Sequence, residues 1–167
     1  MNKLKIEAPA GEPIIVMSRT INAPRALVWE AMTRPEHVAR WWGPREMKTR
    51  VERLDVRPGG GWRFIHTAPD GRSIAFHGEY RDVQPPKCIV QTFGVEGMYD
   101  GRFIVETMTL EEDGERTHYR VVSHFESLAD RDGMIAAGME RGANDSMERL
   151  DELLSTLSQP GNRRRAS

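Results

Sequence analysis

The chain has 167 residues, of which 38% are hydrophobic and 29% are charged, and its formal net charge is −1. This length suits one domain with a hydrophobic core, and the near-neutral charge gives no general attraction to nucleic acid or anionic membranes. Cys88 is the single cysteine, which excludes an intrachain disulfide, and the sequence predicts neither a signal peptide nor a membrane span of about 20 apolar residues. We therefore expect a cytoplasmic protein with one domain. Its folded core should cover about residues 14–157, between loose tails at 1–12 and 158–167.

The first predicted elements are a strand and two short helices. Ile14–Ile21 is dense in β-branched residues, which favours a strand. Pro24 suits the first turn of a helix over about residues 24–32, and Pro35 suits the first turn of a second helix that reaches about Arg40.

Two adjacent tryptophans follow the second helix, and each can bury roughly 200 Å². The sequence Trp41-Trp42-Gly43-Pro44 ends the helix, because Gly and Pro interrupt helical structure. Adjacent residues at the end of a helix point about 100° apart. We therefore expect Trp41 to anchor the short helices against the sheet and Trp42 to approach the mouth of a cavity.

From Met47 the hydrophobic period changes to two, which predicts antiparallel strands joined by short turns. A change of phase near Glu52-Arg53 predicts a β-bulge. The predicted strands cover residues 47–56, 62–67, 76–81, 88–93, 103–110 and 117–125.

The C-terminal region changes to helical spacing. Residues 129–157 carry an apolar stripe that steps by three and four, which predicts one long helix near 40 Å at about 1.5 Å per residue. One face of such an antiparallel sheet must be buried against another element, and only this helix is large enough to cover it. The sequence therefore predicts an α+β fold in which a curved antiparallel sheet of about six to seven strands wraps one long C-terminal helix. The stripe consists of Ile135, Met139, Ala143, Met147, Leu150, Leu154 and Leu157.

Several segments, at residues 21–31, 35–44, 55–62, 76–80 and 138–142, resemble the START/Bet v 1-like superfamily, also called SRPBCC or helix-grip proteins. Within it the chain is similar to the bacterial family related to the C-terminal domain of the heat-shock protein 90 ATPase activator. The resemblance covers about residues 14–157 and implies the helix-grip fold. Relatives include lipid carriers, hormone receptors, polyketide cyclases and a co-chaperone domain, so fold is implied better than function. The family often has an aromatic residue where this chain has Ala143, and a smaller residue there would enlarge the cavity unless a neighbour fills it.

Strand parity and helix spacing place aromatic and small residues on the predicted concave side. Ordinary core packing competes with ligand binding as the interpretation of each residue. Gly78, Gly138 and Gly142 beside large aromatic residues favour a gap that a ligand fills, although close backbone packing also explains glycines. The predicted ligand-binding residues are Trp42, Trp62, Phe64, His66, Phe76, Tyr80, Tyr119, Met139 and Ala143.

The sequence contains no recognisable motif for a catalytic nucleophile, a metal or a cofactor. His66 and His77 fall on opposite faces of paired strands, and no His-x-Glu or Cys-x-x-Cys unit accompanies them. The basic tract 163–165 predicts no nucleic-acid site.

The leading hypothesis is a module that binds a small hydrophobic molecule. The alternatives are a cyclase or dehydratase that uses His66, Tyr80 or Tyr119 for proton transfer, and a co-chaperone-like protein-binding domain.

Overall fold

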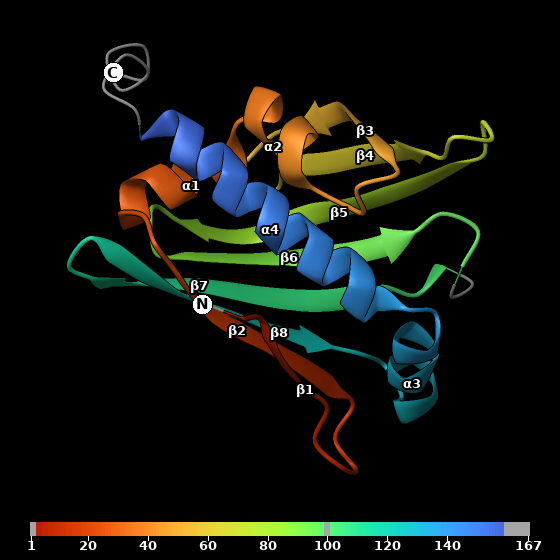
Figure 1. The fold of residues 1–167 in the computed structure, drawn as a ribbon. Coiled ribbons are helices and arrows are strands. Elements are labelled where there is room, and N and C mark those ends of the chain that lie inside the picture. The colour runs from red at the N-terminus through yellow and green to blue at the C-terminus, as the bar shows by residue number, and fades with distance from the viewer. Residues whose placement is uncertain (1–2, 99–100, 159–167) are drawn as a thin grey trace.

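The computed structural model describes residues 3–98 and 101–158, and the basic tract 163–165 lies outside them (Figure 1). Within these residues, eight strands form one antiparallel sheet in the order β1-β2-β8-β7-β6-β5-β4-β3. The elements are β1 (Lys5–Glu7), β2 (Ile14–Ile21), α1 (Arg25–Thr33), α2 (Pro35–Trp41), β3 (Lys48–Leu54), β4 (Gly61–Thr67), β5 (Ser73–Gln84), β6 (Cys88–Val95), β7 (Ile104–Asp113), β8 (Arg116–His124), α3 (Leu128–Ala136) and α4 (Met139–Leu157).

This arrangement confirms the predicted α+β helix-grip fold. Figure 1 shows α4 lying across one face of the curved sheet, with α1 and α2 near its C-terminal end and α3 at its N-terminal end. The predicted bulge is present, because the register between β3 and β4 shifts between Val51 and Arg53. No helix in the described part of the chain is both long enough and apolar enough to cross a membrane.

The sheet has one strand more than predicted, because part of the N-terminal segment expected to be loose forms β1. Residues Lys5–Glu7 pair with β2, and Ile6 lies opposite Met17. Ile6 also packs against the buried cluster that contains Ile15. This apolar contact explains why a three-residue segment without a strong strand pattern joins the sheet edge.

The prediction of one unbroken helix over 129–157 is wrong. The chain forms α3 and α4, and Gly138 between them has a left-handed backbone with φ 85°. Ile135, the first residue of the predicted stripe, is 40% exposed, whereas Met147, Leu150 and Leu154 farther along are buried. The apolar spacing continues across the break, so periodicity alone did not reveal it.

We expect opposite effects on stability from two alanine substitutions at exposed glycines of this region. Gly138→Ala forces an L residue into the left-handed conformation and should lower the free energy of unfolding by about 1 kcal/mol. Gly133→Ala, inside α3, should raise it by about 0.5–1 kcal/mol through helix propensity. A Cβ at either site meets no atom within 4 Å, so neither effect is steric. Chemical denaturation measures both, and stabilisation by both substitutions would indicate a continuous helix.

The buried core is divided into three clusters rather than one continuous layer. The first lies beneath the C-terminal half of α4 and includes Val28 and Leu150, the second lies beneath α2 and includes Val38, and the third lies at the α3 end and includes Phe125. The close backbone contacts of α4 are with α1, α2 and α3, while its contacts with the strands are sparse. Side chains of α4 reach the sheet in the first cluster, which also contains Leu110, Tyr119 and Val121. Elsewhere on the inward face several side chains are only half-buried, namely Phe76, Gln91, Phe93, Glu106 and Met108.

Candidate functional site

The two adjacent tryptophans point into different surroundings. Trp41 is 7% exposed, belongs to the core beneath α4, and donates a hydrogen bond from Nε1 to the carbonyl oxygen of Ala31 at 2.8 Å. Trp42 is half-buried and lies over the sheet. The structure thus places Trp41 between the helices and Trp42 on the concave face.

Trp42 is the centre of an aromatic cluster that extends across three strands. The centroid of its ring lies 4.8–6.5 Å from the centroids of five other aromatic rings, all in edge-to-face or tilted geometry. We call this group the Trp42 cluster: Trp42, Trp62, Phe64 and His66 of β4, Phe76 of β5, and Phe93 of β6.

Hydrogen bonds between backbone atoms of the turn after Trp42 and side chains of α4 hold this turn against the helix. The amide of Gly43 donates to Ser146 Oγ at 2.8 Å, and Arg149 Nη1 donates to the carbonyl oxygens of Gly43 and Pro44 at 3.0 and 3.3 Å. Arg45 adds an exposed ion pair with Glu152. These contacts fix the direction of Trp42. Sequence reasoning missed Ser146 and Arg149, because a helix pattern does not show what its polar face will contact.

His66 lies directly beneath this turn. The imidazole is 3% exposed, and a Cβ placed on Gly43 would lie 2.4 Å from His66 Nε2, so only glycine fits there. Nε2 has no hydrogen-bond partner within the described residues. Burial, assisted by the charge of Arg149, lowers the pKa of His66 to about 4, which keeps the ring neutral at neutral pH.

Two of the three glycines that suggested a gap, Gly78 and Gly138, have a local structural role instead. A Cβ on Gly78 would lie 1.9 Å from the Thr92 carbonyl oxygen and 2.3 Å from Trp62 Nε1, so this glycine admits the indole of Trp62. Gly138 separates the two C-terminal helices, whereas a Cβ on Gly142 would make only an ordinary contact with Pro44, at 3.5 Å. Close packing therefore explains Gly78, and backbone conformation explains Gly138.

A polar row crosses the concave face next to these aromatic side chains. Tyr80 pairs with Gln91, Gln91 with Glu106, and Glu106 with Ser123 in neighbouring strands. Gln91 Nε2 donates to Glu106 Oε1 at 3.3 Å, and Ser123 Oγ donates to Glu106 Oε2 at 3.1 Å. Burial raises the pKa of Glu106 and of the Tyr119 hydroxyl. Glu106 was missed, although its signal was present: a carboxylate in phase with Ile104, Met108 and Leu110.

The structure brings only part of the predicted residue set together. Trp42, Trp62, Phe64, His66 and Phe76 form most of the Trp42 cluster, and Tyr80 belongs to the same core region. Tyr119 lies in the core beneath the C-terminal half of α4, Met139 contacts the cluster at the α3 end, and Ala143 is half-buried on α4.

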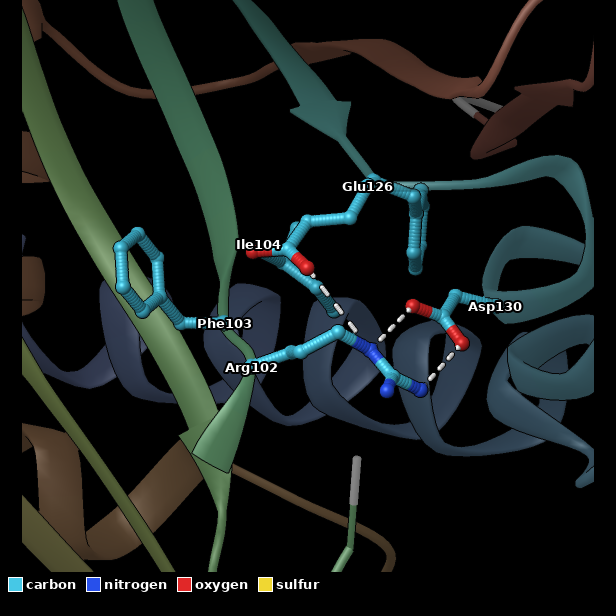
Figure 2. Close-up of a pocket in the computed structure, with 6 residues that line it drawn as sticks. Arg102, Phe103, Ile104, Glu126 and Asp130 are labelled. Carbon is cyan, nitrogen blue, oxygen red and sulfur yellow. Dashed lines mark hydrogen bonds and ion pairs between the residues drawn. The ribbon is translucent and has the colours of Figure 1, made fainter. Parts of the chain in front are cut away.

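Two surface depressions lie away from the concave face. One is a hollow at the α3 end, where Arg102 contacts Asp130 at 3.0 Å and Glu126 at 3.7 Å (Figure 2). Side chains fill it, so it has no room for a molecule the size of water. The other, of about 320 Å³, lies beside the C-terminal half of α4 and is lined by Asn22, Asp151, Leu154, Ser155 and Ser158. Across residues 3–98 and 101–158, no three His, Cys, Asp or Glu side chains are grouped so as to hold a metal ion.

Comparison with solved structures finds the same fold in bacterial proteins. Protein Ms6760 from Mycobacterium smegmatis is 22% identical, with a TM-score of 0.82 over 90% of this chain and 95% of that chain. A protein from Arthrobacter aurescens is 23% identical, with a TM-score of 0.84 over 93% of each chain. A protein from Rhodobacter sphaeroides is 21% identical, with a TM-score of 0.84 over 93% of this chain and 99% of that chain. These likenesses concern the fold alone.

No curated protein matches the sequence. The model of one protein family matches residues 22–155, a range that includes both short helices, β3 to β8, α3 and most of α4. The chain therefore belongs to the family of activator of Hsp90 ATPase homolog 1-like proteins, which has the START-like, SRPBCC fold.

Proposed function

We propose that this protein binds a small hydrophobic molecule between the concave face of the sheet and α4. The observation that carries the proposal is the Trp42 cluster, in which Trp42, Phe76 and Phe93 are only half-buried although they face the helix-covered side of the sheet. Partly exposed aromatic rings on a concave face are favourable contact surface for an apolar ligand. The half-burial of these rings leaves part of their apolar surface available for contact with a ligand.

The protonation states on this face favour binding over proton transfer. The low pKa of His66 keeps its imidazole neutral, and its Nε2 faces the backbone at Gly43. Burial raises the pKa of the Tyr80 and Tyr119 hydroxyls, so neither exchanges a proton readily at neutral pH. These three groups, considered above for a cyclase or dehydratase, are therefore better suited to orienting a ligand.

The proposal is tested by native mass spectrometry of freshly purified protein, followed by titration with the uncharged fluorophore N-phenylnaphthylamine. A co-purified small molecule, or saturable binding at one molecule per chain, supports the proposal. A ligand-free protein that does not bind the fluorophore argues against it, and co-purification of a second protein in place of a small molecule would favour the co-chaperone alternative.

Filling the space beside α4 should weaken this binding. Ala143 is half-buried and lies one helical turn before the buried Met147, so Ala143→Trp places a large ring on the inward side of α4. We expect the fluorophore dissociation constant to rise at least about tenfold, which corresponds to about 1.4 kcal/mol, with a cooperative melt retained. Glu140→Trp, at an exposed position of the same helix, is the control and should bind like the wild type. Equal affinities in all three proteins would place the fluorophore elsewhere.

A further inference from the structure

A carboxyl group lies inside the concave face without a cationic partner. Glu106 shares the inward face of β7 with Ile104 and Leu110, which are 5% and 2% exposed. Its carboxyl oxygens accept hydrogen bonds from the neutral side chains Gln91 and Ser123. No residue in the described part of the chain forms an ion pair with Glu106.

The nearby buried cationic side chain, Arg19, already has other partners. Arg19 enters from β2 with a side chain that is 4% exposed, and its guanidinium binds Asp151 at 2.8 and 3.1 Å and the Met147 carbonyl oxygen at 3.2 Å. Buried carboxylates are normally paired with a cation, because the cost of removing the charge from water is otherwise uncompensated. Burial accordingly raises the pKa of Glu106. A cationic group beside the carboxylate would remove this cost.

The residue that carries this carboxyl group also keeps some exposed surface. Glu106 and Gln91 are half-buried rather than sealed. The Tyr119 side chain, which is 8% exposed, lies close enough to Glu106 to interact with it electrostatically. Met108, one inward position along β7, is half-buried and packs against two of the apolar cores. Polar and apolar side chains therefore lie side by side on this part of the concave face.

We propose that Glu106 is the polar anchor for an apolar molecule that carries a protonated amine. The ammonium group pairs with the Glu106 carboxylate, while Gln91 and Ser123 keep the carboxylate oriented, and the apolar body lies on the concave face. This inference rests on the proposed function and adds the chemistry of the ligand head group. An alcohol supplies a hydrogen bond without charge, and a ligand carboxylate is repelled, so the expected order of affinity is amine, alcohol, carboxylate.

Octylamine, octanol and nonanoate share an octyl tail and differ in head group, so their calorimetric titration at neutral pH isolates the effect of Glu106. The wild type should bind octylamine at least about tenfold more tightly than octanol. In Glu106→Gln, which keeps the side-chain shape, the two affinities should agree within about threefold. Glu111→Gln, at an exposed position of the same strand, is the matched control and should retain the preference for the amine.

The outcomes separate this inference from the proposed function. Equal binding of octylamine and octanol by the wild type overturns the role of Glu106 and leaves hydrophobic binding in place. A preference for the amine that survives Glu106→Gln also overturns it. If none of the three compounds binds, the proposed function fails and this inference fails with it. The head-group order in the wild type remains decisive even if Glu106→Gln does not fold.

Discussion

Trp41→Ala is expected to lower the free energy of unfolding by about 3–5 kcal/mol, a typical cost of truncating a buried tryptophan. Trp41 is 7% exposed, and its indole joins α1, α2 and α4 in one core cluster. The substitution also removes the hydrogen bond from Nε1 to Ala31. Chemical denaturation followed by circular dichroism measures this loss. A loss below about 1 kcal/mol would contradict the anchoring role.

Trp42→Ala provides the matched comparison, because it removes the same side chain one residue later. Trp42 is half-buried, so less apolar surface is lost, and we expect a stability loss of about half that of Trp41→Ala. Its main effect should be on binding of N-phenylnaphthylamine, with a dissociation constant at least about tenfold higher. Equal large losses of stability with unchanged binding would make both tryptophans structural and remove the observation that carries the proposed function.

The stability of the protein should fall between pH 6.5 and pH 4 because of His66. Its pKa is lowered to about 4 in the folded protein, from the 6.5 of a histidine free in solution. As the pH falls through this window, the unfolded chain takes up a proton that the folded protein does not. The unfolding free energy therefore falls by as much as about 3 kcal/mol, and below pH 4 this contribution becomes constant.

His66→Phe isolates this contribution, because it retains a ring against Trp42 and Phe76 without a titratable group. The difference in unfolding free energy between wild type and His66→Phe should change between pH 6.5 and pH 4. His37, whose pKa is also lowered by burial, titrates in both proteins and cancels. Parallel pH profiles for wild type and His66→Phe would contradict the assignment.

The fold could be predicted from the sequence because period and parity are local properties. Alternation placed Trp62, Phe64 and His66 on one face of β4, where all three are buried. The break at Gly138 escaped prediction because the apolar stripe continues across it, and β1 escaped because its pairing with β2 depends on tertiary contacts of Ile6.

The candidate site was less accessible to sequence reasoning. Aromatic residues were recognised as a group, but their assignment to a ligand stays a prediction. Glu106 was missed because a carboxylate within a strand is ordinarily taken to face solvent. Its neighbours Gln91 and Ser123 come from other strands. The polar row forms because the strand register places these residues opposite Glu106. Such cross-strand combinations are invisible along a single strand.

The fastening of the Trp42 turn to α4 also determines when the binding face can form during synthesis. The bond from the Gly43 amide to Ser146 joins residues 103 positions apart, and the bonds from Arg149 span similar distances. Contacts of such long sequence separation form after the loop between them is closed, which slows their formation. The first tryptophan-bearing segment leaves the ribosome long before its partners on α4. Trp42 therefore acquires its final orientation only after the segment that forms α4 has been made.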